Sequence, residues 1–475
     1  MATDVYFNTL GQPAYESAST SYKVGQKGLL LGDPDTLAIR EIANLRMRSA
    51  HSIRNNGYSK AALQKYITSL SAIKVHWKNS KGKKHKKMQK LWEEFVKDPS
   101  LDGYGTFASL QSIWQASIFQ TGAAFTRMMI VRKGNLATVP LKLQAIPTEM
   151  HDLYYQGKTP SDNVKNGIEF DNTKPKTYFF RQGITDAEWQ GRPSIEAVTP
   201  IPADDIVHQF IRESPGQWIG IPLLSSVLLT LYELDELTES TVAKQKAAQA
   251  IAWIIENTNP MSMTPTGVPA METGAEGEEK IVFKSTGGNT QYLNKGEKIH
   301  FYQSTDIGSN LPVLIQSELR KVASATGIPY HSLTQDTGDL DFSSLRAIAT
   351  EFRQRLEFIH HFYTIPLSLI PITDRFKSLA KLYSSKVGDA EASYQLPRWY
   401  GVDELKDTQA DVLEMSYGLG TLQEKLDERH LTFEDVLESA EQVKELETVM
   451  GKPLGGSSSD KQGNNMESNS NSTSG

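Results

Sequence analysis

The stretch from Ser309 to Tyr363 decides the fold and reads SNLPVLIQSELRKVASATGIPYHSLTQDTGDLDFSSLRAIATEFRQRLEFIHHFY. It opens with Asn310 and Pro312, a capping side chain and a proline suited to the first turn of a helix. A glycine and a proline at 327–329 end the run, which predicts a helix over residues 309–328. Its apolar residues recur at helical spacing, at Ile315, Leu319 and Val322.

A polar loop over residues 331–342 joins this helix to a second one. The loop contains three aspartates around Gly338 and neither lysine nor arginine, so its local charge is negative. Such a loop repels phosphate, which suits nucleic acid that slides past it better than nucleic acid that is gripped. The second helix is predicted from Ser343, and its apolar face consists of Leu345, Ile348, Phe352, Leu356, Ile359 and Phe362.

Composition bounds the class of protein. The 475 residues allow about three domains, and 39% apolar residues can fill their cores. A net charge of -6, 22% charged residues and a mean hydropathy of -0.41 are typical of a soluble protein. No run approaches the ~18 apolar residues of a membrane span, and residues 1–17 do not have the pattern of a secretory signal. The absence of cysteine excludes disulfides and thiolate metal sites and fits cytosolic assembly.

Charge is distributed unevenly along the chain. Residues 74–90 contain eight lysines and no acid, whereas residues 403–450 contain fourteen acids and four bases. The negative total argues against a protein that binds nucleic acid by neutralising many phosphates. The lysine run at 78–87 fits either an exposed, mobile connection or a contact with DNA or a scaffold, and both interpretations stay open.

Residues 36–215 combine signals for helices and strands. We therefore predict a mixed α/β chain, mainly helical, with an α/β body over this range. Helical periodicity occurs at 36–54, 59–71, 91–96 and 107–119. Strand patterns bounded by glycine or proline occur at 124–131, 141–146, 178–180 and 206–211.

A stretch without glycine or proline lies between Pro222 and Pro260. It predicts one helix over residues 222–256, about 50 Å long if unbroken. At 243–250 alanines are interleaved with lysine and glutamine, and such small residues let a neighbouring helix approach closely, which indicates oligomerisation. An insertion rich in glycine, proline and threonine follows, with strand signals at 280–284 and 298–303.

The C-terminal third is predicted from composition. Prolines interrupt the apolar pattern of residues 365–400, at Pro366, Pro371 and Pro397. Residues 403–450 predict an acidic helical block. The serine-, asparagine- and glycine-rich end, 455–475, is predicted to be disordered.

Motifs for phosphate-loop, zinc-protease and nucleophile-elbow chemistry are missing from the sequence. His360 and His361 are adjacent, so they point to different faces of a helix and are poorly spaced as metal ligands. The aspartates at 336, 339 and 341 have the oxygen ligands that Mg²⁺ prefers, but a solvated loop is the favoured interpretation. We expect no catalytic residue, no metal and no cofactor.

A serine acyl-enzyme hydrolase of the penicillin-binding type is the alternative function. Ser71 and Lys74 fit S-x-x-K, and Ser161 begins an S-D-N sequence. The third element, K-T-G, is missing, and S-x-x-K recurs at Ser80, Ser378 and Ser458. Four matches in one chain show how little this pattern discriminates, so the enzyme is the weaker interpretation.

Several short stretches occur in a fixed order along the chain. They are LRMRS at 45–49 with RNNGY at 54–58, IPADDIVH at 201–208 with PGQ at 215–217 and GIP at 220–222, GIPY at 327–330 with DFSSLR at 341–346 and EFR at 351–353, and more weakly LKD at 405–407 with QAD at 409–411. As an ordered set they resemble the portal proteins of tailed bacteriophages, in the lambda-like family. Asp341-Phe342 departs from the Asn-Tyr that this family often shows.

This resemblance implies a portal fold built from wing, stem, clip and crown, assembled as a ring around a central channel. It assigns the segments as follows: an irregular N-terminal arm at 1–35, the wing at 36–221, a first stem helix at 222–256, the clip at 257–308, a second stem helix at 309–328, a tunnel loop at 329–342, a long helix with the wing return at 343–402, the crown at 403–454 and a disordered tail at 455–475.

The resemblance also implies the function and partners. Twelve copies would form a ring at one capsid vertex, through which double-stranded DNA is packaged and ejected. The expected partners are further copies of the chain, weakly and non-specifically bound DNA, the terminase large subunit, the head-tail adaptor, the major capsid protein and a scaffold, with no membrane. The expected location is the portal vertex of the virion, after assembly in the host cytoplasm. The protein would not be an enzyme.

Two groups of residues are the predicted channel sites. The tunnel loop contributes His331, Gln335, Asp336, Gly338, Asp339 and Asp341. The stem contributes scattered bases that attract DNA weakly or contact a neighbouring copy, namely Lys244, Lys246, Arg320 and Lys321.

Overall fold

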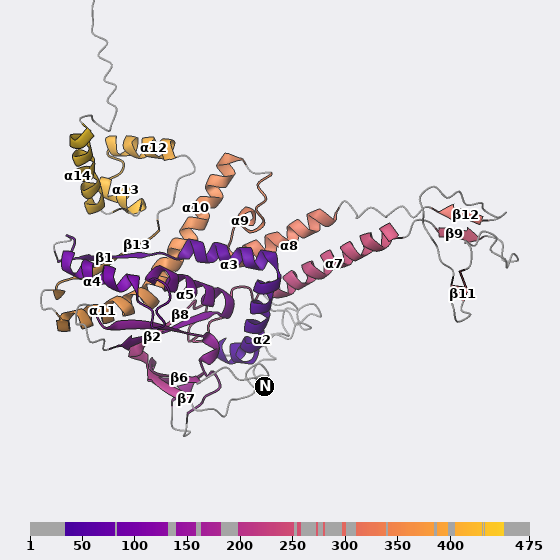
Figure 1. Cartoon of the computed structure of the whole chain (residues 1–475), viewed down its shortest axis with the longest axis horizontal. Helices are drawn as coiled ribbons and strands as arrows, with labels where there is room; N and C mark the ends of the chain where they lie inside the picture. Colours follow the sequence, from indigo (N-terminus) through magenta and orange to yellow (C-terminus); the bar gives the residue numbers. More distant parts are fainter. Residues whose placement is uncertain are drawn as a thin grey trace, which may run out of the picture.

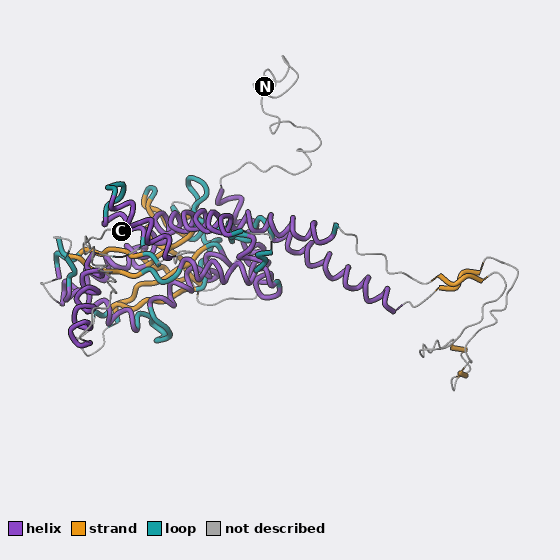
Figure 2. The backbone as a smooth tube through the Cα atoms, turned by 90° about the horizontal axis from the view of Figure 1, so that it is seen from above, coloured by secondary structure: helices purple, strands orange, loops and turns teal. Residues whose placement is uncertain are grey.

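A computed structural model of the chain describes residues 34–80, 83–131, 139–157, 163–181, 198–250, 254–257, 272–273, 279–280, 297–300, 310–338, 341–383, 387–397, 404–429, 431 and 433–450. Figures 1 and 2 show a body of helices and sheets from which two helices project together, α7 (Leu228–Ala250) and α8 (Leu311–Thr326). The predicted mixed, mainly helical architecture is confirmed.

Two helices begin the described chain, α2 (Pro34–Asn55) and α3 (Gly57–Leu70), as predicted. Asn56 lies between them, and its side-chain oxygen caps α3 by accepting the N–H of Ser59 at 3.0 Å. The Nδ2 of Asn56 donates to both carboxylate oxygens of Asp235 on α7, at 2.9 and 3.0 Å. The junction of α2 and α3 is thereby fixed to the base of the projecting helices.

Two antiparallel sheets occupy the centre of the body, with strand orders β3-β2-β8 and β4-β5-β6-β7. Short 3₁₀ turns precede the second sheet at Thr148–Met150 and β8 at Ala203–Asp205. The predicted strands are confirmed, whereas β4, β5 and β7 were missed because they are short. The strands are β2 (Ala123–Ile130), β3 (Leu141–Ile146), β4 (Val164–Lys165), β5 (Ile168–Asp171), β6 (Lys174–Arg181), β7 (Val198–Pro202) and β8 (Ile206–Phe210).

The largest apolar core joins the first sheet to α4 (Lys86–Lys97), α5 (Phe107–Thr121) and α11 (Ile370–Tyr383). A two-stranded sheet of β1 (Lys74–Lys78) and β13 (Glu391–Gln395) closes it. The rings of Trp77, Trp92 and Phe376 pack together, with 4.9 Å between the centroids of Trp92 and Phe376.

The lysine run at 78–87 links β1 to α4, and only its ends, Lys78, Lys86 and Lys87, lie in these elements. Lys83 and Lys84 between them are exposed, which agrees with the interpretation of the run as an exposed connection. In β1 the alternating Val75 and Trp77 are buried while the lysines face outward. Lys84 lies 3.8 Å from Glu438 of the C-terminal helices, so the run contacts the acidic block of the same chain.

A second core between the two sheets packs against two histidines, of which His151 is buried and His208 is half-buried. His208 stacks on Phe125 with 4.3 Å between ring centroids, and His151 lies 4.9 Å from the same ring. Burial lowers the pKa of His151 to about 4 and lowers the pKa of His208 well below its ordinary value. Both side chains are therefore neutral at neutral pH.

Gly122 and Gly220 bring two chain segments into backbone contact. Gly122 ends α5 with a φ of 91°, in the left-handed region. A Cβ atom on either glycine would meet the backbone carbonyl oxygen of the other. This contact places the start of β2 beside the segment that leads into α7.

A continuous helical run crosses the body from α10 (Phe342–Ile359) through a π-helical segment (His360–Leu369) into α11. The prediction of interrupted structure is therefore wrong at Pro366 and Pro371. Pro366 lies inside the π-helical segment, where the hydrogen-bond pattern shifts and a missing N–H is tolerated. The wider π-helical turn also changes which side chains point toward the core. Phe362, which was predicted to lie on the apolar face of the helix, is 63% exposed.

The prediction of one helix over residues 222–256 is wrong at both ends, because α7 begins at Leu228 and ends at Ala250. Residues 223–227 form turns, and the chain turns into strand β9 (Ile254–Asn257), which pairs with β12 (Glu297–His300). Consecutive β-branched isoleucines at 254 and 255 favour this strand. In the insertion, β10 (Glu272–Thr273) pairs with β11 (Glu279–Lys280), and the strand predicted at 280–284 lies mostly outside the described residues.

Three helices form the acidic C-terminal block, as predicted. They lie beside the end of the body opposite the projecting helices (Figure 1), and the Nη2 of Arg346 on α10 reaches Asp407 at 2.6 Å. The helices are α12 (Glu404–Ser416), α13 (Leu422–Glu428) and α14 (Phe433–Met450).

Candidate functional site

The projecting pair α7 and α8 lies side by side in both views (Figures 1 and 2). Near the body its apolar residues, among them Leu231 and Val322, are buried in a shared core. Farther out Val242 is 43% exposed and Val313 is 64% exposed. A pair of helices has little surface in which to bury such residues, so they stay exposed in the single chain.

Gly327 ends α8, and Arg355 of α10 lies against it. It ends α8 in the left-handed region with a φ of 66°, and its N–H donates to the carbonyl of Ala323. A Cβ at this position would collide with the guanidinium of Arg355 on α10. The Nη2 of Arg355 donates to the carbonyl of Thr326 at 3.3 Å, a cation at the negative end of α8. The predicted capping bond from Asn310 at the other end of α8 is absent.

The region predicted as one tunnel loop begins with a helical turn, α9 (Tyr330–Thr334), anchored by buried Leu333. The left-handed residue after it is Gln335, with a φ of 60°. Gly338 is not left-handed, and a Cβ atom there would make only an ordinary contact of 3.5 Å with Asp336. Asp336 accepts the N–H of Gly338 at 3.2 Å, and both are exposed.

Asp341 has a structural role that the sequence did not reveal. Its Oδ1 accepts the N–H of Ser344 at 2.8 Å and its Oδ2 accepts the hydroxyl of Ser343, so it caps α10, which begins at 342 and not at 343. The hydrogen bonds from Ser344 and Ser343 lower the pKa of Asp341. Asp339 lies outside the described residues.

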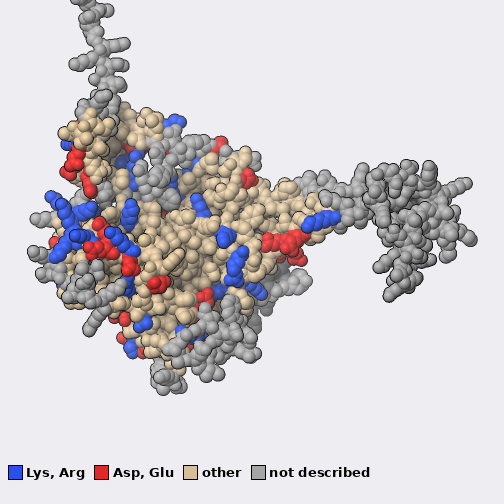
Figure 3. All heavy atoms as spheres, viewed as in Figure 1, with Lys and Arg blue, Asp and Glu red and all other residues tan. Residues whose placement is uncertain are grey.

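The remaining predicted site residues differ in their surroundings. His331 is half-buried on α9, and burial, followed by the charge of Lys65 on α3, lowers its pKa. Arg320 lies 5.7 Å from the ring centroid of Tyr330, and Lys321 pairs with Glu318 at 2.6 Å. Lys244 and Lys246 are exposed and make no ion pair with another described residue. Figure 3 shows acidic side chains on α7 and basic ones toward its outer end.

The alternative acyl-enzyme site is not assembled. Serine and lysine three residues apart meet on a helix, but Ser71 follows the end of α3 and Lys74 begins strand β1. Ser161 lies outside the described residues. In the described part of the chain no three potential metal ligands cluster, and no helix is long and apolar enough to cross a membrane.

The family model described as "Phage portal protein, lambda family" matches residues 29–359, which include most of the body, the projecting helices and α10. The chain belongs to this family. The resemblance stated from the ordered motifs is confirmed, and membership in a family of structural portal proteins also supports the prediction that the chain is not an enzyme.

Two curated relatives match over 266 residues at 23% identity, portal protein B of Escherichia phage lambda and the portal protein of Escherichia phage N15. The matches cover 50% of this chain, and the chain spans 49% and 50% of those relatives.

Two solved structures are similar to this chain at lower identity. One is the neck of a native gene transfer agent particle computed with C12 symmetry (13% identity, TM-score 0.46, 85% of this chain and 95% of that one). The other is an HK97 family phage portal protein from Corynebacterium diphtheriae (11% identity, TM-score 0.34, 76% of this chain and 96% of that one).

Proposed function

We propose that copies of this chain form a ring of twelve at one vertex of a phage capsid, and that double-stranded DNA passes through its centre during packaging and ejection. The proposal rests on the projecting pair α7 and α8, on which Val242 and Val313 are exposed. The chain is a member of the portal family. Side chains of this kind become buried when neighbouring copies pack side by side. The pair is then the stem of the ring.

The other segments take roles that follow from this placement. The paired strands at the tip of the stem are the clip, which docks the packaging motor (the terminase large subunit) and later the head-tail adaptor. The body is the wing, and α12 to α14 are the crown inside the capsid, beside the major capsid protein and the scaffold. The protein is thus assembled in the host cytoplasm and resides in the virion.

In this proposal the loop that follows α9 lines the channel. DNA must move along the axis in both directions, so the wall should hold phosphate weakly and without reading sequence. Asp336 and Asp341 are exposed and no lysine or arginine lies in residues 331–342, so the loop repels the phosphate backbone. Lys244 and Lys246 on the stem supply weak attraction.

The test replaces Asp336, Asp339 and Asp341 by asparagine together. Asparagine is also a good helix cap, so α10 should still form. We expect rings of normal size in electron micrographs, with altered genome length or altered DNA retention in particles. As a control, Glu239→Gln removes an exposed carboxylate of α7 without changing the loop. Normal titre and normal genome length in the triple variant would contradict a channel role for the loop.

A further inference from the structure

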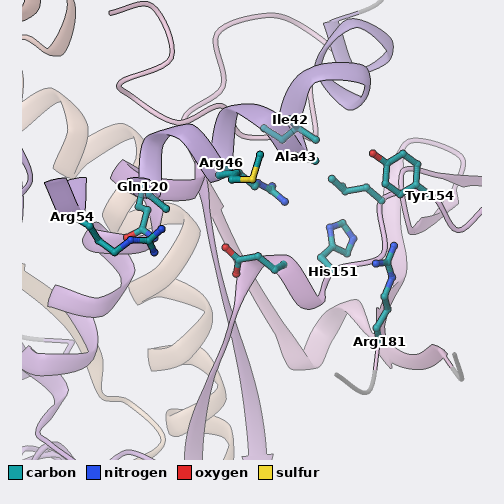
Figure 4. A pocket seen from close by; sticks show the side chains of 12 residues that line it. Ile42, Ala43, Arg46, Arg54, Gln120, His151, Tyr154 and Arg181 are labelled. Atoms are coloured by element: carbon teal, nitrogen blue, oxygen red, sulfur yellow. The ribbon is translucent and has the colours of Figure 1, made fainter. Parts of the chain in front are cut away.

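A cavity of about 290 Å³ lies in the body beside α2, lined by residues from α2, the end of α5 and the segment between β3 and β6 (Figure 4). Helix α2 contributes apolar side chains, among them Ile42, Met47 and Ala50, and the two cations Arg46 and Arg54. The facing wall is polar and includes Glu149 and His151. Nothing in the proposed channel uses this cavity.

Arg46 points into the cavity from α2 (Figure 4) and is 9% exposed. Its Nε donates to the carbonyl of Thr121 at 2.9 Å. Its two terminal nitrogens make no hydrogen bond or ion pair with any described residue. Burial lowers the pKa of Arg46 to about 10, partly opposed by Glu149, so the guanidinium stays charged at neutral pH.

Among the charged side chains that line the cavity, the unpaired cations outnumber the unpaired carboxylates. Arg181 is paired with Asp152 at 2.7 Å. Glu149 is half-buried and pairs with none of the described residues. Arg54, at the exposed end of the lining, adds a second cation, whereas His151 is neutral. Two unpaired cations therefore face one unpaired carboxylate, and the missing partner is an anion.

The exposed side of α2 connects this cavity to the stem. Met47, which lines the cavity, is 37% exposed. One turn along the helix, His51 stacks on Tyr232 of α7 with 6.2 Å between ring centroids, and Tyr232 is 40% exposed. The cavity thus lies on one exposed face with the base of the stem, the element that packs against other copies in the proposed ring.

We propose that a carboxylate side chain of the next copy in the ring enters this cavity and pairs with Arg46, so that the site is complete only in the assembly. The inference rests on the proposed ring. The volume is at the lower limit of ligand pockets and admits side chains but not a helix or a strand. The apolar side chains of α2 contact the methylenes of an aspartate or glutamate, and the guanidinium donates charge-assisted hydrogen bonds to its carboxylate. The terminal nitrogens of Arg46 are not among the buried unpaired atoms of the described residues, so solvent reaches them in the single chain. A carboxylate of the next copy displaces this solvent and pairs with the guanidinium when the ring forms.

The first test compares Arg46→Met with Arg48→Met, an exposed arginine of the same helix that does not line the cavity. Rings are diluted, and mass photometry gives the concentration at which half are dissociated. We expect Arg46→Met to raise this concentration by at least about tenfold and Arg48→Met to leave it unchanged. The melting temperature of the dissociated chain should fall only slightly in Arg46→Met, which loses the hydrogen bond to the carbonyl of Thr121, and should not change in Arg48→Met.

A second measurement does not depend on removing Arg46. The chain contains no cysteine, so Met47→Cys introduces a single thiol at the cavity. We expect a maleimide to react with it about tenfold more slowly in the ring than in the dissociated chain, because the neighbour covers it. A side-chain-resolution map of the ring should place a carboxylate of the next copy within hydrogen-bonding distance of Arg46.

The outcomes separate this inference from the ring itself. A wild-type chain that never forms rings refutes the proposed function and this inference with it. Wild-type rings whose Arg46→Met variant dissociates normally refute the inference alone. A small anion bound to Arg46 in the ring map, or equal maleimide rates in both states, would refute it as well.

Discussion

At the scale of single residues, Gly327 shows how a backbone conformation selects a residue type. Its left-handed backbone ends α8, and the guanidinium of Arg355 from α10 lies where a side chain would stand. The backbone conformation favours glycine, whereas the guanidinium is the movable end of an exposed side chain.

We predict that Gly327→Ala lowers the free energy of unfolding by about 2 kcal/mol, from the left-handed backbone and the displaced Arg355. Gly338→Ala is the matched control, since its backbone is not left-handed and a Cβ there makes only an ordinary contact of 3.5 Å with Asp336. It should change stability by less than about 0.5 kcal/mol. Urea unfolding followed by circular dichroism measures both, and equal effects would contradict this account.

The two core histidines make stability depend on pH. Because the folded chain keeps His151 and His208 neutral far below the ordinary histidine pKa of about 6.5, the unfolded chain binds more protons below that pH. Their stabilising contribution is therefore complete above about pH 6.5 and is lost as the pH falls toward about 4, the folded pKa of His151.

We predict that His208→Phe reduces the slope of melting temperature against pH in this window to roughly half, because one of two titrating groups is removed. Phenylalanine can keep the stack on Phe125. His51→Phe, at an exposed position, should leave the slope unchanged. A His208→Phe variant with the wild-type slope would show that His208 does not titrate in this way.

At the scale of elements, strand β13 from the C-terminal part of the chain pairs with strand β1 from the N-terminal part. It pairs with β1, and the hydrogen bond of 2.7 Å between His76 and Gln395 links positions 319 residues apart. Val387, Ala390 and Leu396 around it are buried in the largest core. This strand, and not the acidic helices after it, completes the body.

Two truncations test that division. A chain ending after Pro397 should retain the melting temperature of the body, since it loses only α12 to α14. A chain ending after Tyr383 should lose more than about 3 kcal/mol of stability, because three core side chains leave with the strand. Calorimetry measures the melting temperature and unfolding free energy of both truncated chains. Equal stability of the two would contradict the conclusion that β13 completes the body.

At the scale of the whole molecule, the proposed ring depends on apolar residues that one chain cannot bury. We predict that Val242→Asp and Val313→Asp prevent ring formation while leaving the circular dichroism and melting of the single chain unchanged. Leu382→Asp, 80% exposed at the far end of α11, is the control and should form rings. Native mass spectrometry gives the number of copies. Rings of normal size from both stem variants would remove the observation on which the proposal rests.

Much of the fold was determined by the sequence alone. The family followed from short motifs in order, and the helices at 36–54, 59–71 and 107–119 followed from apolar periodicity, because these signals are local. The acidity of the loop also followed directly from composition. These features depend on the identity of neighbouring residues and need no knowledge of what lies across the core.

The tertiary structure decided which segments meet. It paired β1 with β13, carried the helix through Pro366 in a π-helical segment, and made Asp341 a helix cap. It also buried Arg46 with two free nitrogens facing a cavity. Local propensity is worth a fraction of a kcal/mol per residue, whereas a core side chain is worth several, so long-range packing outweighs the local pattern wherever the two conflict.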